Sequence, residues 1–354
     1  MHPAFRNTRA AIAFCALLVF LLGLPIMLSW AGAPSREQNF ISMPNQVGPV
    51  GYMAAQIYDD REDTDVLFVG SSRLLHAIDT ELVQKALGTR FGRPARVVKL
   101  ALNWPGEDLQ SYMLREYLER HRVKLLLWNL PQPRAFSDAP HPQAFRWVEF
   151  NDFKQSLSEF SPYYSVLLYS NLVLGAPRQA LTKLFPNLLA NDEKSFQSFT
   201  EHLHLDPEHK VGFGGRPFVL DSLPLPSSSE QDLMTVTSPL LDAVGPFPGA
   251  YQLSHIHRFA DEAKEHGTQV VLLHIPDIQE FGAKRIPELA SWDKVLGPDY
   301  QMIAVPANEL FNGIDRERFL NFFADNNHFN RNGETLFTER ITASILRVLD
   351  HSPG

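Results

Sequence analysis

Two short segments near opposite ends of this 354-residue chain carry side chains that could act together in acyl transfer. In FVGSSRLL (68–75), an apolar run breaks into Gly-Ser-Ser, and the second serine is Ser72. In FFADNNHF (322–329), Asp325 precedes His328 by three residues. A serine hydroxyl becomes a nucleophile when a histidine accepts its proton and a carboxylate orients that histidine. The residue types therefore predict a catalytic triad of Ser72, His328 and Asp325.

The spacing Asp-x-x-His is weak evidence alone, because about one such pair is expected by chance in a chain with 13 histidines. It occurs at Asp138/His141, Asp206/His209 and Asp325/His328. The first two pairs lie in an irregular stretch. The third lies between the last predicted strand and the last predicted helix, where Asn330 or Asn332 could cap the helix. Only the third pair has a position suited to a triad.

The elements that must position these residues alternate along the chain. Short apolar runs typical of buried parallel strands cover 65–70, 95–102, 123–130, 269–276 and 301–306. Helical patterns cover 79–88, 107–121, 251–267 and about 332–349. This alternation predicts a doubly wound α/β fold with a mostly parallel five-stranded sheet. Ligands of such sheets bind at the carboxyl ends of the strands, where we expect both Ser72 and the segment after the last strand.

The alternation is lost between about 132 and 245, a stretch rich in Pro, Phe and Ser. A structureless loop of that length is unusual in a compact domain. We therefore predict a mostly helical insertion that forms a lid or an acceptor groove. The chain then divides into a membrane anchor (1–33), a tether or first helix (34–62) and an α/β domain (63–350) that carries the insertion.

The N-terminal segment is apolar and long enough to span a bilayer. Residues 10–34 carry no charge, and Arg6 and Arg9 precede them. Basic residues in front of a span favour a cytoplasmic N-terminus. We expect an uncleaved, single-pass anchor in a bacterial inner membrane, with the main domain in the periplasm or outside the cell.

Three other interpretations of this segment fit the sequence less well. AGA at 31–33 resembles a signal-peptidase site, but the apolar run is longer than a usual secretory h-region. A lipoprotein anchor at Cys15 would need small residues before the cysteine, and Phe14 is large. A buried core helix is disfavoured by the flanking arginines.

Composition excludes several classes of partner. A net charge of −8 and a pI near 5.9 disfavour a nucleic-acid partner, which requires a basic surface. The single cysteine excludes an intrachain disulfide and an all-thiolate metal site. Two His-x-His pairs, at 202/204 and 255/257, have no evident further ligands. We expect neither a metal nor another cofactor.

The order of these motifs resembles the SGNH (GDSL-type) hydrolase superfamily over about 65–130 and 250–345. Ser72 stands at the position of the family nucleophile, with Ser71 in place of the usual aspartate. Asp325 and His328 match the last block of the family. The α/β-hydrolases are a poorer match, because they would have G-x-S-x-G around the nucleophile.

The middle blocks of the resemblance are looser. Gly106 in NWPG (103–106) follows the second predicted strand, as the family's glycine block does. Asn129 ends the third predicted strand, where the family has Gly-x-Asn-Asp, but its glycine and a second polar residue are absent. The resemblance implies an oxyanion hole formed by the N–H groups of Ser72 and Gly106 together with Asn129. A polar strand end is the alternative role of Asn129.

The resemblance also implies an activity. Anchored domains of this kind transfer or remove acyl groups, often acetyl, on envelope or secreted polysaccharides. We expect a membrane-anchored esterase or O-acyltransferase that acts on such a glycan beside an integral membrane acyltransferase supplying the acyl group. The alternative is a non-catalytic SGNH-like protein that binds glycan or scaffolds an assembly complex.

Overall fold

The computed structural model describes residues 7–41, 50–102, 106–129, 140–141, 144, 148–158, 162–189, 250–281, 295–297, 300–325 and 327–351. The histidine pair at 202/204, the Asp206/His209 pair and Asp138 lie outside the described residues.

A five-stranded, all-parallel sheet forms the centre of the protein. Its strands are β1 (Thr64–Ser71), β2 (Val97–Leu102), β3 (Val123–Asn129), β4 (Gln269–Leu273) and β5 (Gln301–Ile303). Each of the five predicted apolar runs is confirmed as a strand. The order β2-β1-β3-β4-β5 is that of flavodoxin-like sheets, in which the carboxyl ends of β1 and β3 border the usual ligand crevice.

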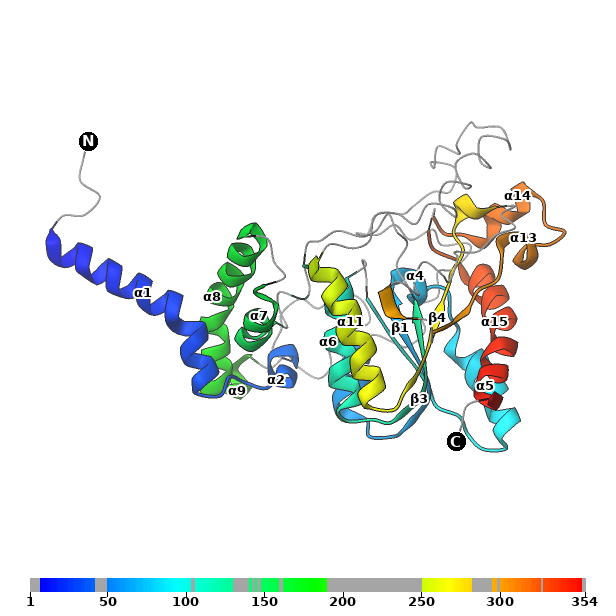
Figure 1. Ribbon diagram of the computed structural model, residues 1–354, viewed down its shortest axis with the longest axis horizontal. Coiled ribbons are helices and arrows are strands. Elements are labelled where there is room, and N and C mark those ends of the chain that lie inside the picture. Colours follow the sequence, from blue (N-terminus) through cyan, green and yellow to red (C-terminus); the bar gives the residue numbers. More distant parts are fainter. Residues whose placement is uncertain are drawn as a thin grey trace.

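Helices cover both faces of the sheet, so the predicted α/β class and doubly wound arrangement are confirmed (Figure 1). One face carries α6 (Glu107–Leu118) and α11 (Ala250–Glu265), and the other carries α5 (Thr80–Phe91) and α15 (Arg331–His351). The buried strands are apolar on both sides because each face packs against helices. Shorter helices near the site are α4 (Ser72–Leu75), α13 (Ala307–Leu310), α14 (Arg316–Phe319) and the 3₁₀ helices Ile278–Glu280 and Leu320–Phe322.

The described part of the predicted insertion is helical. It contains α7 (Phe150–Ser156), α8 (Pro162–Leu184) and α9 (Pro186–Leu189). These helices lie beside the N-terminal helix α1 (Thr8–Trp30) and away from the sheet (Figure 1). The proposed lid or acceptor groove concerns mainly 190–249, which lie outside the described residues.

The segment 34–62 contains three short helices, α2 (Arg36–Ile41), α3 (Val50–Ala54) and the π-helix Ala55–Asp59. Phe40 and Ile57 are buried in the same core as α6. Arg36 pairs with Glu116 of α6 at 2.8 Å and with Asp152 of α7 at 3.0 Å. This segment therefore packs against the α/β domain as a set of short helices and is not an extended linker.

Helix α1 is long enough and apolar enough to cross a membrane, and its most apolar window of 18 residues has a mean hydropathy of 2.7. Only 11% of that window is buried, whereas the core helix of a soluble protein is mostly buried. A core role for this helix is therefore excluded in the described structure. A membrane span and a signal sequence both fit its length and composition.

Candidate active site

The turn from β1 to α4 presents Ser72 at the carboxyl edge of the sheet. Gly70 is required there by close contact, because a Cβ at this position would lie 2.8 Å from Cβ of Asn129 and 3.0 Å from Cβ of Leu74. The chain can therefore pass from strand to helix in a tight turn. Ser71 is the residue before the helix, and Ser72 is its first residue, with 8% of its surface exposed.

The Asp-x-x-His segment is a short loop closed by backbone and aromatic contacts. Phe323 and Phe329 form an antiparallel bridge at its base, and their rings pack at 4.8 Å between centroids. The N–H of Ala324 donates to the carbonyl of His328 at 2.8 Å. These contacts bring Asp325 and His328 onto one side of the loop.

Asn330 joins this loop to the last helix. Its Oδ1 accepts from the N–H groups of Asn332 at 3.0 Å and Gly333 at 3.2 Å, which caps α15 as predicted. Its Nδ2 donates to the carbonyl of Asn321 at 2.7 Å on the other side of the loop. One side chain thus fixes both the start of the helix and the base of the His328 loop.

Ser72, His328 and Asp325 form one chain of hydrogen bonds. The distance from Ser72 Oγ to His328 Nε2 is 2.8 Å. His328 Nδ1 lies 2.7 Å from Asp325 Oδ2 and 2.8 Å from Oδ1. An ionised carboxylate can only accept, so Nδ1 carries the proton and Nε2 is left to accept the Ser72 hydroxyl proton. This is the arrangement in which a serine hydroxyl can be deprotonated as it attacks a carbonyl.

The electrostatics of the pair favour that arrangement. Burial alone would raise the pKa of Asp325, but hydrogen bonds from His328 and from two backbone N–H groups hold it below its ordinary value. Asp325 is therefore ionised at neutral pH. Its contribution to stability is present above the carboxyl pKa of the unfolded chain and is lost as the pH falls through the lowered folded value. The histidine and aspartate side chains are 11% and 20% exposed, so solvent reaches the site.

The loop formed by residues 75–79 packs against the His328 ring. His76 is buried, and its ring meets the His328 ring edge to face at 5.5 Å. Lys99 of β2 donates from Nζ to the carbonyls of Leu75 at 2.8 Å and Ile78 at 2.6 Å. Thr338 of α15 accepts from the N–H of Asp79 at 2.9 Å. This loop therefore ties β2, the Ser72 helix and α15 together.

Lys99 and His76 were not singled out in the sequence analysis as supports of the site. The signal for Lys99 was present, because a lysine within the apolar strand VVKLAL is costly to bury without acceptors. His76 carried no comparable signal, since its contact with His328 depends on the tertiary fold.

The implied oxyanion-hole residues lie at the same edge of the sheet. Asn129 ends β3 beside Gly70, and its Nδ2 donates to the carbonyl of Leu273 at 3.3 Å. Gly106 precedes α6, and a Cβ there would lie 2.6 Å from Cβ of His141. His141 is 2% exposed, so a residue from the otherwise rejected Asp138/His141 pair is packed against Gly106. The roles of Gly106 and Asn129 as oxyanion donors stay predictions.

Two buried carboxyl groups begin α6 next to Gly106. Burial and the neighbouring Asp108 raise the pKa of Glu107 to about 8, so this carboxyl is protonated at neutral pH. Asp108 accepts from the N–H of His141 at 2.9 Å and from the hydroxyl of Tyr251 at 3.0 Å. Asp108 thereby holds His141 in place, and a neutral Glu107 adds no negative charge where an oxyanion is expected.

The remaining histidines noted in the sequence have other surroundings. His255 is fully buried between the rings of Tyr112 and Tyr251, and burial lowers its pKa to about 3. His274 pairs with the buried Glu280 at 2.9 Å. Among the described residues, no group of three His, Cys, Asp or Glu side chains could hold a metal ion.

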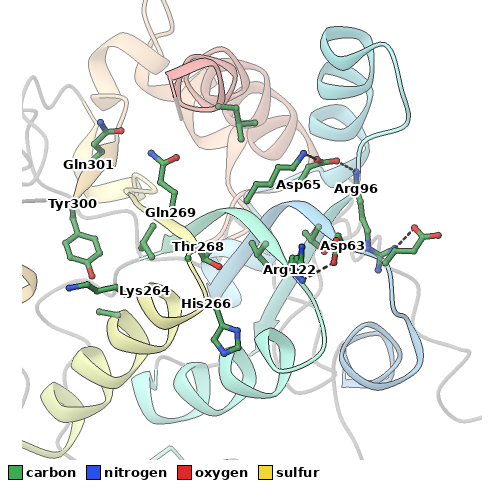
Figure 2. Close-up of a pocket in the computed structure, with 18 of the residues that line it drawn as sticks. Asp63, Asp65, Arg96, Arg122, Lys264, His266, Thr268, Gln269, Tyr300 and Gln301 are labelled. Carbon is green, nitrogen blue, oxygen red and sulfur yellow. Dashed lines mark hydrogen bonds and ion pairs between the residues drawn. The ribbon is translucent and has the colours of Figure 1, made fainter. Parts of the chain in front are cut away.

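A large hollow lies at the opposite, amino edge of the sheet (Figure 2). Asp65, at the start of β1, accepts from Arg93 and from Lys124 at 2.9 Å, and from the backbone N–H of Arg96 at 3.0 Å. Arg96 also pairs with Asp60 at 2.6 Å. These three basic side chains are therefore paired with acidic residues. The hollow lies at the amino edge of the sheet, opposite the carboxyl edge that carries Ser72.

Comparison with known proteins gives no assignment. No protein-family model matches the chain, and no curated protein matches it.

We predict that Gly333→Ala destabilises the protein by about 1–3 kcal/mol or more, as overpacking in a core does. A Cβ at Gly333 would lie 2.2 Å from the carbonyl oxygen of Phe322 and 2.6 Å from the Phe329 ring. Urea denaturation in mild detergent measures the change. Gly88→Ala in α5 is the matched control, because a Cβ there comes no nearer than 3.4 Å to a neighbouring atom, the Arg93 carbonyl oxygen. It should leave stability unchanged or raise it by about 0.5–1 kcal/mol. Equal effects of the two substitutions would contradict the close packing under the His328 loop.

We predict that Lys99→Met lowers the free energy of unfolding by about 1–3 kcal/mol, because the carbonyls of Leu75 and Ile78 lose a buried donor. The same denaturation experiment tests this prediction. Lys85→Met, on the exposed face of α5, should change stability by less than about 0.5 kcal/mol. A Lys99 variant as stable as the Lys85 variant would show that the 75–79 loop does not depend on this lysine.

Proposed function

We propose that the protein is a serine esterase or O-acyltransferase in which Ser72 is the nucleophile. The observation that carries this proposal is the chain of hydrogen bonds from Ser72 through His328 to Asp325. It lies at the carboxyl edge of the sheet, beside the crevice between β1 and β3 where ligands of doubly wound sheets bind. A purely structural Gly-Ser-Ser turn would not require a histidine and a carboxylate in this order.

The proposed reaction has two steps. His328 Nε2 takes the proton of Ser72 as Oγ attacks the acyl carbonyl, and the imidazolium then gives that proton to the leaving alcohol. The acyl group, now on Ser72, passes to water or to a sugar hydroxyl, whose proton His328 takes and then returns to Ser72 Oγ as the Ser72 ester bond breaks. The N–H groups of Ser72 and Gly106 and the amide of Asn129 are the proposed donors to the oxyanion.

The substrate follows from the resemblance to SGNH hydrolases, which is itself part of the proposal. The acyl group is acetyl, and the acceptor or substrate is a cell-envelope or secreted polysaccharide. An integral membrane acyltransferase is the proposed donor partner. The parallel sheet order and the Asp-x-x-His loop before the last helix support the resemblance from which this substrate is inferred.

The proposed location is the bacterial inner membrane, with α1 as an uncleaved anchor and the α/β domain in the periplasm or outside the cell. Two contacts favour retention of α1. The hydroxyl of Tyr169 on α8 donates to the carbonyl of Leu22 at 2.6 Å, and Lys183 donates to the carbonyls of Ala31 and Gly32. Cleavage after residue 33 would remove all three acceptors from α8.

A fluorophosphonate probe, which phosphonylates activated serines, tests the proposed nucleophile in the full-length protein in detergent. We expect the wild type to be labelled, Ser72→Ala to lose labelling, and His328→Ala to be labelled about 10²–10⁴-fold more slowly, the usual contribution of a general base. Ser71→Ala is the matched control, because Ser71 is adjacent but makes no side-chain bond at the start of α4. It should be labelled like the wild type.

Circular dichroism establishes that each variant is folded. Continued labelling of Ser72→Ala would contradict the proposal. So would the absence of labelling in a folded wild type both alone and in membranes that contain the partner acyltransferase. That second outcome would favour the non-catalytic glycan-binding or scaffold protein.

A further inference from the structure

Helix α8 is apolar on two opposite faces. Its inner face is buried, with Leu168, Leu172 and Ala176 spaced four residues apart. Its outer face exposes large apolar side chains at separations of three, four, seven and eight residues, which place them on one side of the helix, and this face continues into α9. The members of this outer face, and their exposed fractions, are Tyr163 (69%), Val166 (67%), Leu174 (78%), Leu181 (43%), Leu184 (69%), Phe185 (54%) and Leu188 (69%).

This outer face is unusual for a protein surface. A helix at the surface of a globular domain has one apolar stripe directed to the core and polar residues opposite it. A run of exposed apolar side chains over about seven helical turns of chain is the kind of patch that marks a contact with a membrane or another protein. The patch therefore needs a partner that is itself apolar.

The position of α8 indicates which partner this is. The helix packs along the C-terminal half of α1, where Tyr169 bonds to Leu22 and Lys183 bonds to the carbonyls of Ala31 and Gly32 (Figure 1). The exposed side chains of α1 are equally apolar, as at Val19, which is 70% exposed. A bilayer that contains α1 would therefore also meet α8.

The charges of the segment fit a membrane surface. From 162 to 189 the sequence contains two cations, Arg178 and Lys183, and no aspartate or glutamate. Anionic lipid headgroups attract basic side chains and repel acidic ones, so an apolar helix without acidic residues meets no electrostatic barrier at such a bilayer. Contact with a second copy of the chain or with a partner protein would not by itself require basic residues without acidic ones.

We propose that the outer face of α8 and α9 rests in the bilayer beside α1, so that the protein contacts the membrane through two elements. The inference rests on the proposed membrane location of α1. Two membrane contacts would also fix the orientation of the α/β domain. The buried ion pairs of Arg36 with Glu116 and Asp152 join the segment after α1 to α6 and α7. The α/β domain is held in one orientation at the membrane, with the sheet not free to rotate about a single anchor.

Spin labels at single cysteines test this proposal in the full-length protein. Cys15 is the only cysteine, so Cys15→Ser gives a background for Val166→Cys, Leu174→Cys and Leu188→Cys. The probe membrane is a vesicle of phosphatidylcholine and phosphatidylglycerol. Power saturation compares collisions with oxygen, which concentrates in hydrocarbon, and with a water-soluble nickel chelate.

Two further sites calibrate the measurement. Val19→Cys reports the lipid contact of α1, and Gln84→Cys on the exposed face of α5 reports water. We expect oxygen collisions to exceed nickel collisions several-fold at Val166, Leu174 and Leu188, as at Val19, and the reverse at Gln84.

Each other result overturns the proposal in a distinguishable way. Nickel access at Leu174 and Leu188 with lipid contact at Val19 would leave the anchor in place and reject the membrane contact of α8. Low access to both reagents at these sites would mean that a protein, either a second copy or a partner, covers the face. Nickel access at Val19 would reject the membrane location of α1 itself, while the labelling of Ser72 would be unaffected.

Discussion

The hydrogen bond between Ser72 and His328 joins residues that are 256 positions apart in the chain. In the proposed reaction neither residue can act alone, because the serine needs a base and the base needs Asp325 to fix its tautomer. The sheet supplies the common frame, since β1 delivers Ser72 and the segment after β5 delivers His328 to the same edge. The sheet therefore brings the two side chains within 2.8 Å of each other.

Ser72 and His328 are held at this distance mainly by close packing and by side chains that hydrogen-bond to the backbone. Glycine at 70 and at 333 lets the strand-to-helix turn and the last helix approach neighbouring atoms more closely than any side chain would allow. Asn330 then closes the His328 loop through its amide. A buried lysine, Lys99, holds the loop behind the serine through two carbonyls. Such contacts make the geometry a property of the folded chain that exists before substrate binds, which is what preorganised catalysis requires.

The sequence predicted the sheet well because buried parallel strands are uniform apolar runs, as in residues 65–70 and 123–130. It also placed Ser72 and Asp325/His328 at one edge, since the carboxyl ends of parallel strands share that edge. It was less informative about 34–62, where Arg36 and Phe40 pack into the domain through contacts with residues far along the chain. His76 was unpredictable for the same reason, because no local pattern records a ring contact across the fold.

Whether Ser72 is an activated nucleophile is tested most directly by peptide mapping with tandem mass spectrometry after reaction of the wild-type protein with a fluorophosphonate. We predict one phosphonyl adduct, on the peptide that contains Ser72 and at that residue rather than at Ser71. An adduct confined to another serine, or none on folded protein, would contradict it.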